Sequence, residues 1–406
     1  MKEIVRVFLA ATKLGLVSFG GPAAHIGYFH DEYVRRRKWL DAQSYADLTA
    51  LCQFLPGPAS SQAGIGIGMM RAGFAGGVAA WLGFTWPSAF LMIGFALGLN
   101  RWAERFGGAD AGWLHGLKLV AVAVVAQAVW SMGRQMAANR PRAAMAVGSA
   151  VLVTLWPAAA GQWAAILAGG IIGALAFRSA ATVGAEAGGA RTDGEGTTPE
   201  RAPLSRPLAL CCLVLSALLL FALPLAHSLW PGTTLAMFDA FYRSGALVFG
   251  GGHVVLPLLE KETVAAGWVE PGRFLAGYGA AQALPGPLFT FAAFLGMEAG
   301  GWTGALTAIL GIFLPGFLLI AGALPFWDAL RRLPRMRAAL AGVHAAVVGV
   351  LLAALYHPIW TSTIRAPEDF ALAAALFGAS AYLRCPPWLL VLLGAIAGEG
   401  LALAAR

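Results

Sequence analysis

Four short motifs of glycine and proline interrupt apolar stretches of the chain. They are Phe19-Gly20-Gly21-Pro22, Leu55-Pro56-Gly57-Pro58, Phe249-Gly250-Gly251-Gly252 and Leu284-Pro285-Gly286-Pro287. A break in an apolar helix leaves backbone groups unpaired, which a bilayer tolerates only where they line a cavity or are buried in protein. The helix that restarts after such a break directs its partly positive N-terminus at the gap. We therefore expect the four breaks to form a binding site for an anion.

Polar side chains able to bind an oxyanion lie beside these breaks. They are Ser60, Ser61 and Thr290 after the Pro-Gly-Pro motifs, Gln53 and Gln282 three residues before them, and His25 and His253 after the glycine turns. Their amide, hydroxyl and imidazole groups can all donate hydrogen bonds to oxygen. The alternative is that the breaks are packing kinks whose hydroxyls only cap helices.

Two cations occupy equivalent places before the glycine breaks. Lys13 and Arg243 each lie about one and a half turns ahead of a break. A charge inside the bilayer costs at least about 2.5 kcal/mol, so we expect both to face a cavity and to compensate the charge of an anion. Snorkelling to the membrane surface is the alternative. Lys118 and His344 form a second cationic pair, for which a shallow place near a helix end is the competing explanation.

The composition requires these residues to be positioned by membrane-spanning helices. The chain is 59% hydrophobic and 12% charged, with a mean hydropathy of +0.70, which is more apolar surface than a soluble core of 406 residues can hide. Charge-free runs long enough to cross a bilayer indicate an all-α polytopic membrane protein. The expected spans are 75–99, 113–137, 207–226, 301–324, 338–356, 370–383 and 388–403, with a hairpin of two spans over 143–177.

Several classes of function conflict with the same sequence. The four cysteines lie in apolar runs without metal-ligand spacing, and there is no His-Glu-x-x-His motif, so we expect neither a metal, nor another cofactor, nor an enzyme. The sequence pI of about 9.6 comes from charges at helix ends and not from one basic face, which argues against nucleic acid as a partner.

The chain repeats itself on either side of a polar linker. Motif residues of the first half recur 230 positions later at the glycine breaks and 229 positions later at the Pro-Gly-Pro motifs. Duplicated halves are a common build for secondary transporters. We predict a first repeat over 1–177 (the first half), a flexible linker over 178–206, a connecting transmembrane helix over 207–230, and a second repeat over 236–406 (the second half).

Loop charges predict that the two repeats are inverted. Lys and Arg concentrate in cytoplasmic loops. The loop with Arg35, Arg36, Arg37 and Lys38 is basic, whereas its counterpart reads Glu260, Lys261, Glu262 and Glu270, and the bias reverses in the loop with Arg331, Arg332, Arg335 and Arg337. This topology requires the chain to fold back at the first glycine break and at Pro56-Gly57-Pro58. The alternative is one kinked span over 48–70.

At these motifs the chain resembles a known family. Phe19-Gly20-Gly21-Pro22 with His25, the basic stretch ending in Trp39-Leu40, and Gln53 through Pro58 are similar to the chromate ion transporter family of bacteria and archaea. The second copy of the motifs resembles the C-terminal domain of the long, two-domain form. Gly252 stands where the first half has Pro22, which puts His253 two places closer to its break, so the two histidines need not be equivalent.

The resemblance implies a secondary transporter that exports chromate and confers chromate resistance. Its partners would be chromate or a sulfate-like dianion and the lipid bilayer, in the inner (plasma) membrane of the cell. A proton-coupled importer of sulfate or another oxyanion, and a passive anion channel of the same fold, are the alternatives. The coupling ion and the formation of a homodimer stay open at this point.

Overall fold

The computed structural model describes residues 1–105, 111–176, 204–230, 232–249, 251–327, 333–383 and 385–404. Within these ranges every regular element is a helix, as the composition predicts. The predicted linker lies outside the described residues except for its last three positions. Gly250, Arg331 and Arg332 also lie outside them.

The helices of the two halves follow one another in a similar order. In the first half they are α1 (Lys2–Val17), α2 (Gly21–Phe29), α3 (Ala42–Phe54), α4 (Ala59–Arg105), α5 (Gly112–Met136), α6 (Arg140–Leu155) and α7 (Ala159–Ala176). After the linker come α9 (Arg206–Leu229), α10 (Thr233–Ala246), α11 (Val255–Thr263), α12 (Pro271–Ala281), α13 (Phe291–Ala323), α15 (Pro334–Ala354), α16 (Thr361–Thr363), α17 (Pro367–Ala381) and α18 (Pro387–Ala404).

Length and apolar composition make this a polytopic membrane protein. Six helical stretches of the described residues are long and apolar enough to cross a bilayer: Ala59–Leu99, Gly112–Met136, Arg206–Leu229, Leu288–Phe326, Arg335–Thr363 and Pro387–Ala404. Large apolar side chains also point outward, including Phe221, which is 76% exposed on α9, and Ile396, which is 70% exposed on α18. Such a surface is stable in lipid and not in water.

In two of these stretches the chain reverses direction part-way along the helix. In α4 the backbone leaves the helical region at Ala72 and Gly73, and in α13 it does so at Gly300 and Gly301. Beyond the first reversal, Gly76 returns to Gly68 so closely that a β-carbon on either would collide with the other's carbonyl oxygen. A straight helix would hold these two residues about 12 Å apart. Each stretch is therefore a short arm followed by a long span.

The chain also folds back at both Pro-Gly-Pro motifs. A β-carbon on Gly66 of α4 would lie 2.8 Å from the side chain of Leu48 on α3, although a straight helix would separate them by about 27 Å. In the second half Gly277 of α12 packs in the same way against Phe294 of α13. The hairpin predicted at Pro56-Gly57-Pro58 is confirmed, and the single kinked span over 48–70 is wrong.

Ion pairs show that the chain folds back at the glycine breaks as well. Lys13 Nζ lies 2.7 Å from Glu32 Oε2, and Arg243 Nη1 lies 3.0 Å from Glu262 Oε1. Each pair joins residues 19 positions apart, which a straight helix would hold about 28 Å from each other. Each half therefore begins with two consecutive hairpins whose tips are the glycine break and the Pro-Gly-Pro motif.

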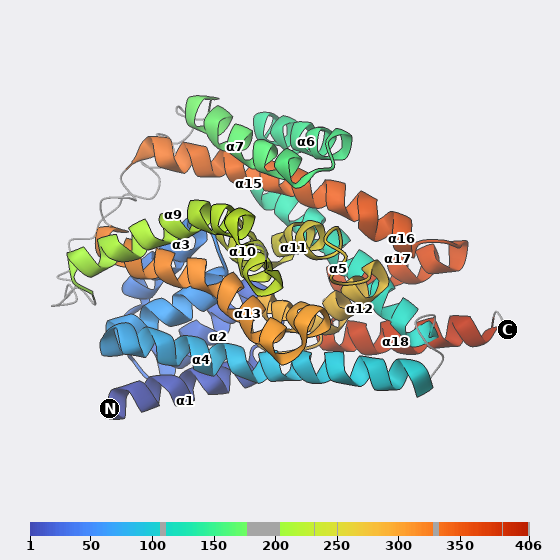
Figure 1. Ribbon diagram of the computed structural model, residues 1–406, viewed down its shortest axis with the longest axis horizontal. Helices are drawn as coiled ribbons and strands as arrows, with labels where there is room; N and C mark the ends of the chain where they lie inside the picture. The colour runs from blue at the N-terminus through green and yellow to red at the C-terminus, as the bar shows by residue number, and fades with distance from the viewer. Residues whose placement is uncertain are drawn as a thin grey trace.

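Most of the long helices run along the long axis of the molecule, and the two termini lie at its opposite ends (Figure 1). Helix α1 lies beside α4, while α6 and α7 cover α15 on one side. Helix α5 packs between α12, α17 and α18. The tips of the hairpins are thus enclosed by spans from both halves.

The core joins the two halves directly. Helices α4 and α13 pack against each other, with ring contacts between Trp81 and Phe313 and between Phe74 and Phe317.

At the surface, α3 begins where Asp41 accepts hydrogen bonds from the amide and the hydroxyl of Ser44. The hydroxyl bond and then the amide bond lower the pKa of the Asp41 carboxyl, because both favour its ionised form.

Candidate anion-binding site

The hairpin tips of the two halves meet through a reciprocal pair of backbone hydrogen bonds. The Gly57 amide donates to the carbonyl oxygen of Val248 over 2.7 Å, and the Gly286 amide donates to the carbonyl oxygen of Ser18 over 2.8 Å. Ser18 and Val248 are the residues just before the two glycine breaks. Each Pro-Gly-Pro tip of one half is therefore held by the glycine break of the other, and all four breaks gather in one place.

Glycine is required at both of these tips by backbone conformation and by space. Gly57 has a φ of +118° and Gly286 a φ of +91°, values that residues with a side chain rarely adopt. A β-carbon on Gly57 would lie 3.2 Å from the α-carbon of Gly316, and one on Gly286 would collide with the hydroxyl of Ser88. A side chain therefore does not fit at either of these two positions.

A small cavity of about 70 Å³ opens at this junction, and we call it the central cavity. Its polar lining consists of Gly20 and Gly21 of the first break, His253 after the third, Gln282 and Gly286 of the fourth, Gln127 of α5 and Ser380 of α17. Apolar side chains such as Val124, Leu284 and Leu390 complete the wall. The first, third and fourth breaks thus contribute to one cavity, whereas no residue of Leu55-Pro56-Gly57-Pro58 is among its described lining residues.

The helices that restart at the breaks polarise this cavity. Helix α2 begins at Gly21, after Gly20 as its N-cap with a φ of +98°, and neither residue caps the helix with a side chain. The first backbone N–H groups of a helix lack partners within it and carry its positive dipole end. The start of α2 is thus suited to an anion at the cavity wall.

Several buried polar atoms near the tips have no hydrogen-bond partner among the described residues. They are Nε2 of Gln282, Nε2 of His25, the hydroxyls of Ser18 and Ser61, and Oε1 of Gln62. Buried polar atoms are normally paired, so such a group of exceptions indicates a place where water or a ligand binds. The hydroxyl of Thr290, in contrast, donates to the carbonyl oxygen of Pro287 over 2.8 Å and only caps its helix turn.

The two histidines occupy different surroundings, as the shift between the motifs predicts. His253 borders the central cavity, with its Nδ1 2.7 Å from the hydroxyl of Tyr278. His25 is 1% exposed and does not line that cavity; its Nδ1 lies 3.2 Å from the hydroxyl of Ser60. The structure therefore favours His253 as the imidazole that meets a ligand.

Lys13 and Arg243 face carboxylates, and neither lines the central cavity. Lys13 pairs with Glu32, and its side chain is 46% exposed. Arg243 makes two parallel bonds to Glu262, at 3.0 and 3.1 Å, and a further ion pair of 2.9 Å with Asp239. The prediction that these cations compensate the charge of the anion is not supported by this geometry, because their charge is already balanced by neighbouring carboxylates.

The other predicted residues are dispersed. Lys118 lines a second, larger cavity, while His344 lies on α15, which packs against α6 and α7, and borders neither cavity. Gln53 is exposed, although it stands at the same distance before its Pro-Gly-Pro motif as Gln282 does. The structure thus separates two amides that the sequence presents as equivalent.

The sequence analysis missed the carboxylates that pair with Lys13 and Arg243. It also missed two residues that line the central cavity from distant helices. Glu32 and Glu262 follow the same 230-residue offset as Lys13 and Arg243, so a search for conserved spacing between the halves finds them. Gln127 and Ser380 carry no such signal, because they lie on ordinary spans far from any break. Only the packing of α5 and α17 around the tips brings them to the cavity.

Comparison with known proteins decides the family. The family model described as Chromate transporter matches this chain twice, over residues 5–174 and over residues 235–399. The chain belongs to the chromate transporter family. Each match includes one pair of hairpins, and the unmatched segment between the two matches contains the linker and all of α9.

Relatives from the family cover most of the chain. A chromate transport protein of Pseudomonas aeruginosa is 30% identical over 358 residues, which is 85% of this chain and 79% of that protein. A chromate transport protein of Cupriavidus metallidurans is 27% identical over 367 residues, 87% and 82% of the two chains. A probable chromate transport protein of Synechococcus elongatus is 27% identical over 371 residues, 87% and 84%. No solved structure matches the chain.

Proposed function

We propose that this chain exports chromate from the cytoplasm across the inner membrane and so confers resistance to chromate. The observation that carries the proposal is the junction of the breaks: reciprocal backbone bonds of Gly57 and Gly286 join the two halves beside a cavity into which Gln282 brings an unpartnered amide donor. The names of the most similar relatives agree with chromate as the substrate.

Neutral hydrogen-bond donors would hold the dianion in the central cavity. The amide Nε2 of Gln282, the imidazole of His253 and the backbone at Gly20 and Gly21 surround the space. Donors of this kind orient tetrahedral oxygens, and the dipole of α2 adds a partial positive charge. Binding without a full cation would allow the dianion to leave again, which a transport cycle requires.

In this scheme Lys13 and Arg243 brace the first hairpin of each half. Their ion pairs to Glu32 and Glu262 join the two arms of each hairpin below the glycine break. The braces would fix the direction in which each break presents its backbone groups. The two halves would be inverted repeats that rock about the crossed tips and open the cavity to one side at a time.

The membrane potential can supply the driving force for export. Moving one charge through 100 mV is worth about 2.3 kcal/mol, so a dianion that leaves a negative-inside cell gains about 4.6 kcal/mol. At about 1.4 kcal/mol for each factor of ten, this corresponds to a gradient of roughly 2000-fold. Export therefore requires no further energy source.

Transport by the purified chain in liposomes tests this proposal. We expect saturable uptake of chromate into vesicles with an imposed potential that is positive on the inside, and faster loss of chromate from chromate-sensitive cells that express the chain. Sulfate in excess serves as competitor. Uptake of sulfate driven by a proton gradient, or flux of chromate that does not saturate, would assign the chain to an importer or a channel instead.

A further inference from the structure

Three cationic side chains line a cavity that is separate from the central cavity. A cavity of about 270 Å³, which we call the vestibule, is bordered by Lys118 of α5, by 270–273, Leu275 and Ala276 at the start of α12, and by Ser362 and Arg365. Three of its lining side chains are basic, Lys118, Arg273 and Arg365, against one carboxylate, Glu270. Its lining is therefore positive overall.

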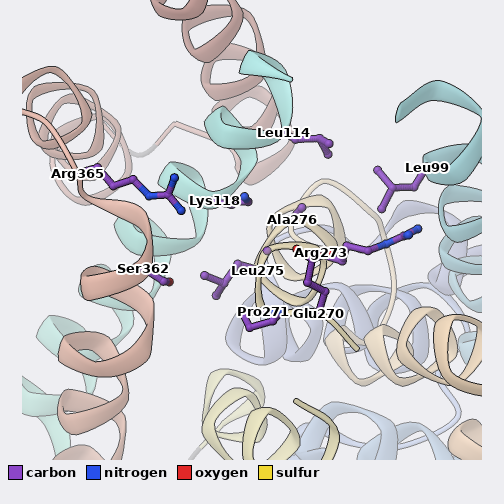
Figure 2. Close-up of a pocket in the computed structure, with 11 residues that line it drawn as sticks. Leu99, Leu114, Lys118, Glu270, Pro271, Arg273, Leu275, Ala276, Ser362 and Arg365 are labelled. Atoms are coloured by element: carbon purple, nitrogen blue, oxygen red, sulfur yellow. The ribbon is translucent and has the colours of Figure 1, made fainter. Parts of the chain in front are cut away.

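Two of these cations are directed at the same space. Figure 2 shows the side chain of Arg365 extending toward Lys118, whereas Arg273 extends away from both toward Leu99. Arg273 forms an ion pair with Glu298, with Nε and Oε2 2.8 Å apart, so its charge is balanced there. Lys118 and Arg365 are the other two cations of the vestibule lining, and Glu270 is its carboxylate.

The start of α12 adds backbone donors to the same wall. Glu270 is the N-cap and Pro271 the first residue of the helix, so the amides of Gly272 and Arg273 have no partner within it. A β-carbon on Gly272 would lie 3.0 Å from Nζ of Lys118, which places this bare stretch of backbone directly beside the ammonium group. An anion that reaches Lys118 would also meet these amides.

The vestibule and the central cavity are built on the same three elements. Helix α5 supplies Lys118 to one and Gln127 to the other, and α12 supplies Gly272 to one while Gln282 follows directly after its end. The helical rise makes each of these steps about 14 Å. Arg365 lies just before α17, whose Ser380 lines the central cavity. The two cavities therefore lie one after the other along the bundle of α5, α12 and α17.

We propose that the vestibule is a second binding site for a tetrahedral oxyanion such as chromate or sulfate, with Lys118 and Arg365 as its principal ligands. This inference rests on the proposed function, because the vestibule receives or supplies the dianion of the central cavity. Its full cations collect the dianion by charge, whereas the neutral donors of the central cavity orient it. Ser362 and the amides of Gly272 and Arg273 complete the ligand set.

Equilibrium binding of labelled sulfate to the purified full-length chain tests the site independently of transport. We expect two bound anions per wild-type chain, one in the K118Q/R365Q variant, and two in Gln282→Leu, of which one is bound about tenfold more weakly. The exposed cation Arg140 on α6 provides a control, since Arg140→Gln removes a charge that lines neither cavity and should leave two bound anions. An unchanged stoichiometry in K118Q/R365Q would overturn the proposal.

Chromate transport gives the second readout. Hydrogen bonds to charged groups are strong enough that losing one raises the half-saturating concentration of chromate by about tenfold. We expect this rise in Lys118→Gln and in Arg365→Gln, with the maximal rate retained, a weaker dependence on ionic strength, and recovery in Lys118→Arg and Arg365→Lys. A lower maximal rate at unchanged half-saturation would contradict a binding role. Failure of the wild-type chain to transport chromate would reject the proposed function. The number of sulfate ions bound per chain would still test whether the vestibule is a binding site.

Discussion

The amide of Gly57 donates a hydrogen bond of 2.7 Å to the carbonyl oxygen of Val248, and this contact joins residues 191 positions apart in the chain. Its counterpart from Gly286 to Ser18 makes the connection reciprocal. Buried in an apolar medium, such backbone bonds are costly to leave unmade. The crossed tips therefore form a pivot that holds both halves at the cavity.

Substitution of Gly286 at the pivot should lower both stability and transport. Gly286→Ala places a methyl group against the hydroxyl of Ser88 and forces a φ of +91° on alanine, so we expect a loss of about 1–3 kcal/mol and of transport. The double variant Gly286→Ala with Ser88→Gly should regain part of the stability. Thermal unfolding in detergent measures both. Gly378→Ala on α17, where the new methyl group meets nothing within 4 Å, is the control.

The two braces should respond unequally to neutralisation. Arg243→Gln leaves the carboxylates of Asp239 and Glu262 without their guanidinium partner, which typically costs about 3–5 kcal/mol when the charges are buried. Lys13→Gln should cost less, because Glu32 keeps its bond from Arg37, at 2.8 Å. Surface expression and thermal unfolding of the two variants provide the comparison.

A double variant that neutralises both Lys13 and Glu32 distinguishes a structural ion pair from a ligand of the anion. If Lys13 only balances Glu32, then K13Q/E32Q should transport chromate at least as well as Lys13→Gln alone, because no uncompensated carboxylate remains from the pair. Initial rates in vesicles with equal amounts of protein measure this. Loss of transport in K13Q/E32Q with an unchanged unfolding temperature would indicate that Lys13 contacts the anion.

The amides before the Pro-Gly-Pro motifs should differ in importance. Gln282→Leu removes an unpartnered donor from the central cavity, and we expect it to raise the half-saturating concentration of chromate by about tenfold. Gln53→Leu changes an exposed side chain and should leave that value within about twofold. Equal effects of the two substitutions would show that the cavity at Gln282 is not the binding site.

Close packing of α5 on α12 should be essential between the two cavities. A β-carbon on Gly279 would collide with the carbonyl oxygen of Leu117, so Gly279→Ala should push the helices apart and destabilise the chain by about 1–3 kcal/mol. Gly133→Ala on α5, which meets nothing within 4 Å, is the matched control and should be neutral or slightly stabilising. Unfolding temperatures that agree within error would contradict this packing role.

The sequence by itself determined the membrane class, the helix breaks at the four glycine and proline motifs, and the spacing of those motifs, but not the reversals at Gly73 and Gly301. These follow from local chemistry, because about 20 apolar residues form a span and Gly-Pro motifs interrupt a helix wherever the chain goes. Even the acidic partners Glu32 and Glu262 were accessible from the offset that relates Lys13 to Arg243. The tertiary structure decided which of these residues meet.

Equivalent positions acquired different roles because the surroundings of the two halves differ. Gln282 lines the central cavity, where Gln127 and Ser380 join it from distant spans, while Gln53 is exposed. Lys118 lines the vestibule together with Arg365, which is 247 positions away in the chain. Contacts of this kind depend on how whole helices pack, and local sequence patterns carry no information about the far side of a packed interface.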